Sequence, residues 1–178
     1  MILIRLSFKI KGMKQITKSI LVAAVVFVTT GLLKAQAVFD ISVKDINGQV
    51  TSISEVSTGE LIVLDFWATW CKPCVKSIPK LNKLSEKYNP DQVSFVGINQ
   101  DSPRNTNKVK PFVNSMGVKY PILLDPEQEL MAELLVVSYP TLIVLNQKAE
   151  VLFFHEGYTT GDERLIEDEI NKLLGYHE

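Results

Sequence analysis

The fold of this chain is decided by the stretch from residue 61 to residue 74, which reads LIVLDFWATWCKPC. Residues 61–67 form a nearly continuous apolar run, as a strand buried on both faces of a sheet requires. Asp65 is the exception, because it places a carboxyl group inside that run. After Pro73, apolar residues recur at helical spacing, at Ile78, Leu81, Leu84 and Tyr88. The stretch therefore predicts a buried strand followed by an amphipathic helix, with two cysteines at their junction.

Upstream of this stretch, the sequence predicts an N-terminal β-hairpin. Residues 39–43 and 50–53 are short runs of strand-forming residues, and Asn47-Gly48 between them is a strong turn signal.

Downstream, apolar runs alternate with helical patterns. They predict a strand at 93–98, a helix ending at Met116 before Gly117, a strand at 122–124, a helix at 127–135, a β-hairpin at 141–145 and 151–155, and a last helix from about 160 to 174. Thr160 and Glu163 have the spacing of a capping box at the start of that helix. No repeat or low-complexity linker interrupts the pattern. We therefore expect residues 38–178 to form one α/β domain in which strands alternate with helices.

The first 37 residues have the composition of a secretory signal peptide. They contain six basic and no acidic side chains, an apolar run at 20–33, and then Ala35-Gln36-Ala37. That run is shorter than the roughly 20 apolar residues of a membrane-spanning helix. We expect cleavage after Ala37, with Met13 as an alternative start and an uncleaved N-terminal membrane anchor as the alternative outcome. The mature protein is then expected to be soluble in the periplasm or another extracytoplasmic compartment.

Charge argues against a nucleic-acid partner. The chain has 19 basic and 20 acidic residues, and loss of the six basic residues in the signal leaves a net charge of −7. An acidic protein of this kind repels the phosphate backbone.

The only two cysteines are Cys71 and Cys74, separated by Lys72 and Pro73. A structural disulfide framework in an exported protein usually has more pairs at longer spacing. At the start of a helix, unpaired backbone N–H groups and the helix dipole favour a thiolate. Cys71 is therefore the candidate nucleophile and Cys74 the candidate resolving thiol.

Three other interpretations of the cysteine pair are a zinc site, a haem attachment site and an inert structural disulfide. A zinc site lacks a second ligand pair, since only His155 and His177 remain. Haem attachment requires a histidine directly after Cys74, where this chain has Val75. We expect no metal and no organic cofactor, and no catalytic role for either histidine.

The segment from Asp65 to Cys74 resembles the active-site segment of thioredoxin-fold proteins. Pro79 matches the kinking proline of that family's active-site helix, and Tyr139-Pro140 matches its cis-proline position. The export signal, the opening hairpin and the inserted strand and helix between 99 and 135 are similar to the TlpA/ResA-like branch of exported thiol-disulfide oxidoreductases. The resemblance covers essentially residues 38–175. It implies a thioredoxin fold, with a central mixed sheet flanked by helices, and dithiol–disulfide exchange, with substrate contacts from four residues: Trp70, Pro73, Tyr139 and Pro140.

One position departs from that branch. Its members commonly carry a glutamate three residues after the second cysteine, where this chain has Ser77. Asp65 offers a replacement, because the matching aspartate of thioredoxin lies buried behind the second cysteine and takes up or delivers its proton. A carboxyl in an apolar strand should be buried with a raised pKa. The alternative is a strand-end side chain that reaches solvent.

The resemblance also implies partners. These are disulfide-containing exported proteins as clients and a membrane-embedded disulfide reductase as electron donor. DsbA-type oxidants carry a histidine between the cysteines and a large helical insertion, and neither is present, so a reductant role is favoured, including cytochrome c maturation. A DsbA-like oxidant or isomerase is one alternative, and a thioredoxin-like binding or chaperone module is another. The lysines of the helix at 76, 80, 83 and 87 are expected to form a solvated face.

Overall fold

The computed structural model describes residues 38–176, so the expected signal peptide, the alternative start at Met13 and His177 lie outside it. Seven strands form one sheet in the order β2-β1-β5-β4-β3-β6-β7. The strands are β1 Val43–Asp45, β2 Val50–Thr51, β3 Leu61–Trp67, β4 Val93–Asn99, β5 Ile122–Leu124, β6 Thr141–Asn146 and β7 Val151–Glu156. The helices are α2 Ile53–Val56, α3 Lys72–Ser85, α4 Thr106–Met116, α5 Glu129–Glu133 and α6 Asp162–Leu173. No helix within residues 38–176 is long and apolar enough to cross a membrane.

The sheet is mixed, as the family resemblance implies. β3 and β4 are parallel, as are β4 and β5, whereas β6 runs antiparallel to β3. The carboxyl ends of β3, β4 and β5 therefore meet the amino end of β6 at one edge of the sheet. This edge brings together residue 71, the residues after Asn99 and the residues before Thr141.

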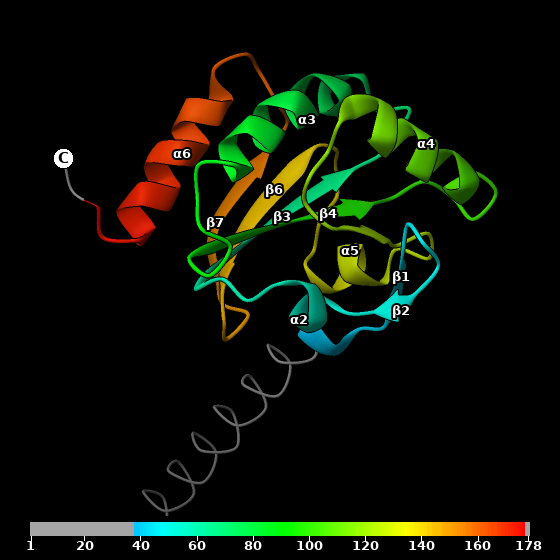
Figure 1. Cartoon of the computed structure of the whole chain (residues 1–178), viewed down its shortest axis with the longest axis horizontal. Helices are drawn as coiled ribbons and strands as arrows, with labels where there is room; N and C mark the ends of the chain where they lie inside the picture. The colour runs from blue at the N-terminus through cyan, green and yellow to red at the C-terminus, as the bar shows by residue number, and fades with distance from the viewer. Residues whose placement is uncertain (1–37, 177–178) are drawn as a thin grey trace, which may run out of the picture. The chain divides into compact units, whose positions relative to one another are not determined.

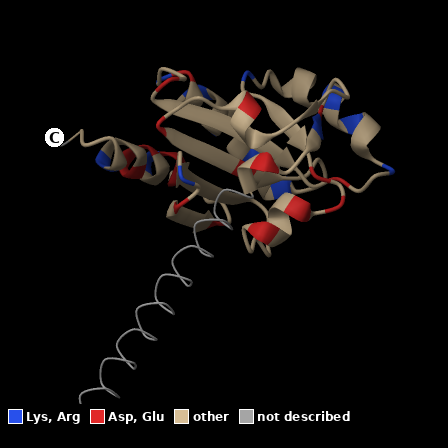
Figure 2. Cartoon of the chain, turned by 90° about the horizontal axis from the view of Figure 1, so that it is seen from below, with Lys and Arg blue, Asp and Glu red and all other residues tan. Residues whose placement is uncertain are grey.

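Helices cover both faces of the sheet (Figure 1). The alternation of β3 sends Leu61, Val63 and Trp67 into a cluster with buried residues of α3, α4 and α6. The intervening residues of β3 face the opposite side, where Figure 1 shows α2 and α5. All seven residues of β3 are buried. Figure 2 accordingly shows few charged residues on the strands and most of them on helices and loops.

The N-terminal hairpin forms, but its bounds differ from those predicted. β1 begins at Val43 rather than residue 39, and residues 38–40 are helical. Phe39 is buried in the core instead of alternating along a strand, as is the preceding Val38. The second strand ends at Thr51, because Ile53 starts the short helix α2 and is itself fully buried. Core packing of Phe39 and Ile53 thus replaces strand pairing at both ends.

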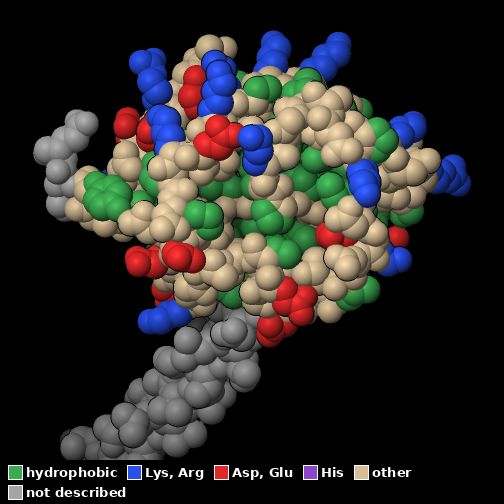
Figure 3. Space-filling model, in the orientation of Figure 1, with side chains coloured by type: hydrophobic (Ala, Val, Ile, Leu, Met, Phe, Trp, Pro, Cys, Tyr) green, Lys and Arg blue, Asp and Glu red, His purple; other side chains and the backbone are tan. Residues whose placement is uncertain are grey.

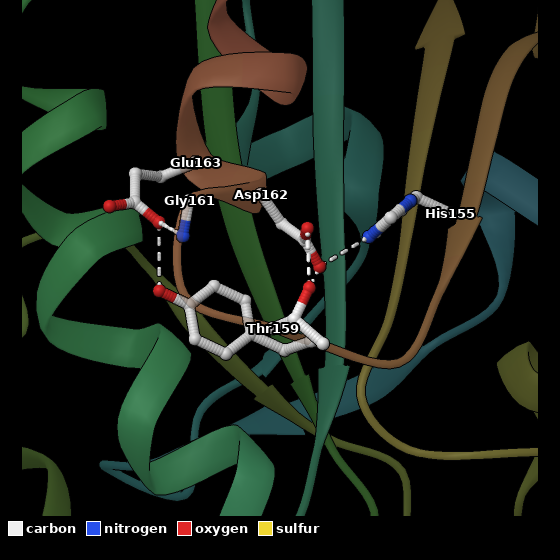
Figure 4. Close-up of polar contacts among 6 residues, drawn as sticks. His155, Thr159, Gly161, Asp162 and Glu163 are labelled. Atoms are coloured by element: carbon white, nitrogen blue, oxygen red, sulfur yellow. Dashed lines mark hydrogen bonds and ion pairs between the residues drawn. The ribbon is translucent and has the colours of Figure 1, made fainter.

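The predicted capping box of the last helix is wrong. Gly161, not Thr160, is the N-cap of α6. The Glu163 carboxylate accepts from the Gly161 backbone N–H, and the Asp162 carboxylate accepts from the Thr159 N–H and hydroxyl (Figure 4). The Nε2 atom of His155, in β7, lies 3.1 Å from the same Asp162 carboxylate, so this histidine contacts the first turn of α6.

The lysine-bearing face of α3 is exposed and partly paired with α6. Lys87 lies 2.6 Å from Glu167, and Lys80 lies 4.0 Å from Glu163. Basic side chains gather along the upper edge of the molecule in Figure 3, where Figure 1 places α3. Exposed ion pairs of this kind contribute little stability, which fits a solvated face.

Candidate active site

The cysteine pair lies where β3 gives way to α3. The Cys71 backbone N–H donates to the carbonyl of Ala68 at 3.1 Å, and this turn brings Cys71 to the N-cap of α3. Pro73 follows in the first turn, where its missing N–H costs no helical hydrogen bond. Cys71 and Cys74 form a disulfide, with Cα atoms 5.3 Å apart. The structure thus joins the two cysteines that the sequence singles out.

The two sulfur atoms have different environments. Cys71 is 5% exposed and Cys74 is fully buried. The Cys74 backbone N–H donates to the Cys71 sulfur at 3.2 Å. On reduction, this donor and the positive end of the helix dipole would both stabilise a thiolate at Cys71.

We expect reduced Cys71 to be the faster-reacting thiol, with a pKa below that of a free cysteine. The N-cap hydrogen bond favours its thiolate, whereas the burial of Cys74 favours the neutral thiol. The pH dependence of alkylation by iodoacetamide, with mass-spectrometric assignment of the label, measures both thiols. Faster alkylation of Cys74, or a Cys71 pKa above about 8.5, would contradict this assignment.

The Tyr139-Pro140 peptide bond is cis, as predicted, and its loop lies beside the cysteine segment. The rings of Tyr139 and Trp70 meet edge to face with centroids 5.7 Å apart. Trp70 is 63% exposed, Pro73 is exposed, Tyr139 is half-buried and Pro140 is buried. The predicted contact residues therefore form a partly open apolar rim next to the disulfide. Trp67, by contrast, is buried and stacks on Phe112, as expected of a core residue.

Asp65 is buried, with 2% of its surface exposed, and does not reach solvent. Strand alternation places it between Val63 and Trp67, on the sheet face covered by α3, and both neighbours share a buried cluster with Cys74. Neither carboxylate oxygen has a hydrogen-bond partner. Burial raises the pKa of Asp65 to about 7, although the nearby Tyr120 hydroxyl opposes that rise. The group can therefore change protonation near neutral pH.

Ser77 occupies the position where the related branch commonly has a glutamate. Its hydroxyl is buried and donates to the Cys74 carbonyl at 3.0 Å. At this position α3 therefore carries a hydroxyl that is hydrogen-bonded to the backbone, and not a carboxylate that could exchange a proton with Cys74.

A buried carboxylate that the sequence reasoning missed anchors the loop before Cys71. Asp101 accepts from the Thr69 N–H at 2.8 Å, from the Thr69 hydroxyl at 2.7 Å and from the Asn99 amide at 2.8 Å. Asp101 lies two residues after the buried strand β4. Side chains at the carboxyl ends of parallel strands meet at one edge of the sheet, so this position could have indicated a role beside Cys71. Asp101 thus fixes the backbone two residues before Cys71.

Replacing Asp101 by alanine should lower the free energy of unfolding by about 3 kcal/mol, because the Thr69 N–H and the Asn99 amide would lose a buried acceptor. Urea denaturation of the disulfide form measures this change. Asp91→Ala is a matched control, because Asp91 is exposed. Equal effects of the two substitutions would show that Asp101 does not anchor the loop.

A second buried carboxylate, Asp125, links the inserted helix to the same edge. It accepts from the backbone N–H groups of Glu129 and Met131 and from the Gln100 side chain. The Met131 sulfur in turn accepts from the Tyr139 hydroxyl at 3.0 Å. The cis-proline loop is therefore held to α5, and through it to the end of β5.

A disulfide-bonded cysteine pair at a helix start, beside a loop that carries a cis-proline at the edge of a mixed sheet, places the protein in the class of thioredoxin-fold thiol-disulfide oxidoreductases. Its residues 35–154 match the model of the AhpC/TSA family, and the chain belongs to that family. It is 34% identical over 134 residues to the thioredoxin-like protein YneN of Bacillus subtilis, an alignment that covers 75% of this chain and 77% of YneN.

Two further relatives carry names that refer to thiol–disulfide chemistry. The thiol-disulfide oxidoreductase ResA of Bacillus thuringiensis is 32% identical over 110 residues, which cover 62% of each protein. The crystal structure of a putative thiol:disulfide interchange protein DsbE from Chlorobium tepidum is 28% identical, with a TM-score of 0.68, and the match covers 76% of this chain and 93% of that one. These similarities confirm the predicted fold and the resemblance to ResA-like proteins.

Proposed function

We propose that this protein is an exported reductant that transfers two electrons from its cysteine pair to disulfides of other exported proteins. The observation that carries the proposal is the disulfide-bonded Cys71–Cys74 pair at the start of α3, in which both cysteines are buried but Cys71 keeps 5% of its surface exposed and Cys74 none. The apolar rim of Trp70, Pro73 and Tyr139 beside it offers a surface for client polypeptides.

The proposed exchange has two steps. The Cys71 thiolate attacks one sulfur of a client disulfide, whose S–S bond breaks to release one client thiolate and leave a mixed disulfide. The Cys74 thiol then gives its proton to the Asp65 carboxylate and attacks the Cys71 sulfur. The second client thiolate leaves, and the enzyme retains the Cys71–Cys74 disulfide. The client disulfide is reduced by two electrons and the enzyme dithiol is oxidised by two.

The reductant direction is supported by what lies between and around the cysteines. Lys72 and Pro73 separate them, without the histidine of DsbA-type oxidants. Between β3 and β6 the chain forms three helices of 14, 11 and 5 residues around two strands, rather than a large helical insertion. The similarity to proteins named thiol-disulfide oxidoreductase ResA and thiol:disulfide interchange protein DsbE supports the exchange chemistry, and cytochrome c maturation is one setting that we propose for the reductant direction.

The proposal also includes the compartment and the electron donor. Residues 1–37 support export to the periplasm or an equivalent space, as a soluble protein after cleavage or as a protein held by an uncleaved anchor. An exported reductant has no soluble thiol pool to restore it. We therefore propose a membrane-embedded disulfide reductase as its electron donor.

The reduction potential of the Cys71–Cys74 pair tests the direction. Equilibration with dithiothreitol buffers should give a value near the roughly −270 mV of thioredoxin, and a value near the −120 mV of DsbA would favour an oxidant. The difference of about 150 mV corresponds to roughly 7 kcal/mol. Failure to reduce insulin disulfides with dithiothreitol as donor would instead favour a binding or chaperone module.

A further inference from the structure

Asp65 lies opposite a glycine at the centre of the sheet. In the parallel pairing of β3 and β4, Asp65 is in register with Gly97. A Cβ at Gly97 would lie 3.2 Å from the Tyr120 ring and 3.1 Å from the Trp67 indole nitrogen. Both aromatic side chains therefore close over the Gly97 backbone. The missing side chain leaves room for both rings and for Ile122, whose Cδ1 would lie 2.5 Å from such a Cβ.

Tyr120 lies two residues before β5, and the pairing of that strand with β4 holds it in this place. The Gly97 N–H donates to the Pro121 carbonyl at 2.9 Å, and Gly97 is in register with Ile122 of β5. The Tyr120 ring also packs against Phe95, with centroids 6.3 Å apart. At 8% exposure, Tyr120 is a buried phenol next to a buried carboxyl.

The hydrogen bonds at this place are incomplete. Neither Asp65 oxygen has a partner, and the indole N–H of Trp67 has none either. A neutral carboxyl tolerates such a site far better than an ionised one, because a buried charge without a donor is very costly. If Asp65 accepts the Cys74 proton, it must first exist as a carboxylate, and that carboxylate needs a donor.

We infer that Tyr120 is a positioning residue for Asp65, whose hydroxyl donates a hydrogen bond to the ionised carboxylate and holds it ready to accept the Cys74 proton. The inference rests on the proposed role of Asp65 and names a second residue for it. One proton moves from the Cys74 sulfur to an Asp65 oxygen, and Tyr120 keeps its own proton throughout. Burial, followed by the charge of Asp65, raises the Tyr120 pKa well above its ordinary value, so the phenol remains a donor.

Within residues 38–176, no charged side chain faces Asp65 from the elements packed against it, so burial and the Tyr120 hydroxyl are the main influences on the Asp65 pKa. β4 and β6 oppose it with Gly97 and Leu142, which carry no charge. From α3, the buried polar side chains are the Cys74 thiol and the Ser77 hydroxyl, and Ser77 already donates to a carbonyl. The α4 residues in the cluster on this face are apolar. The Tyr120 hydroxyl lowers the Asp65 pKa relative to burial alone.

The test replaces Tyr120 by phenylalanine, which keeps the ring and removes the donor. Titration of Asp65 is followed by carboxyl ¹³C NMR in the disulfide form, where neither cysteine titrates. The midpoint should rise by about one pH unit, as loss of a hydrogen bond to a charged group implies. Tyr88→Phe is the matched control, because the Tyr88 ring also packs against Phe95 but its hydroxyl donates to Asn171. In the Tyr88→Phe protein the Asp65 midpoint should be unchanged.

The kinetic readout is the pH profile for resolution of a Cys71-linked mixed disulfide. Because Asp65 acts as a base, a raised pKa moves the acid limb to higher pH, so Tyr120→Phe should slow resolution several-fold at pH 7 and leave it unchanged at pH 9. In an Asp65→Asn background the same substitution should not move the profile. An unchanged Asp65 midpoint in folded Tyr120→Phe would overturn the inference. Full-speed resolution by Asp65→Asn would instead remove the proposed role of Asp65.

Discussion

Replacing Cys71 by serine is expected to reduce disulfide exchange by on the order of 10⁴-fold or more, the scale on which enzymes lose activity with their nucleophile. Cys71 is the cysteine nearer the surface, at the N-cap of α3. A serine hydroxyl at that position has no thiolate to offer and cannot form a mixed disulfide. Insulin reduction, with dithiothreitol as donor, measures the loss.

Cys74→Ser is the matched control for that experiment. It leaves the attack by Cys71 in place and removes the thiol that resolves the mixed disulfide. We expect the Cys74→Ser protein to accumulate covalent complexes with clients, visible on non-reducing gels and absent from Cys71→Ser. Accumulation of such complexes by Cys71→Ser instead would reverse the roles of the two cysteines.

Replacing Asp65 by asparagine should slow resolution of the mixed disulfide by about 10²-fold at neutral pH, the usual contribution of a general base. Asparagine keeps the shape of the side chain but cannot accept the Cys74 proton. Single-turnover decay of a Cys71-linked mixed disulfide isolates this step, and attack by Cys71 on a client disulfide serves as the internal control. Equal decay rates for the two proteins would leave Asp65 a structural residue.

The same substitution should raise stability in a pH-dependent way. The Asp65 carboxyl has a pKa of about 7 in the folded protein against 3.8 for the ordinary group, so the unfolded chain binds fewer protons between these values. The free energy of unfolding of the wild type should therefore fall as pH rises from about 4 to 7, by up to roughly 4 kcal/mol. Asp65→Asn lacks this loss. Urea denaturation at pH 4 and pH 8 should show near-equal stability at pH 4 and a more stable variant at pH 8, and the opposite trend would contradict the burial of a neutral carboxyl.

Local sequence patterns determined the central strand β3 and the residues of the candidate active site. The apolar run 61–67 predicts β3 to the residue, and Gly117, which adopts the left-handed conformation, ends α4 where predicted. The CxxC pair, the cis bond at Tyr139-Pro140 and the burial of Asp65 were all predictable. Each depends on a short segment whose own residues restrict its conformation or polarity, through a continuous apolar pattern, a glycine or a proline.

Only the tertiary structure decided which residues distant in sequence contact those segments. Thr69 depends on Asp101, 32 residues away, and Asp65 lies beside Tyr120, which precedes another strand. Phe39 and Ile53 lie outside the hairpin strands in which the sequence placed them, because both side chains are buried in the core. Such contacts are set by strand order and register, since β4 brings Gly97 and Asp101 next to β3 and β5 brings Tyr120 over Gly97. A single sequence encodes that order only through the free energy of the whole core, and its local patterns therefore identify the reacting groups but not their neighbours.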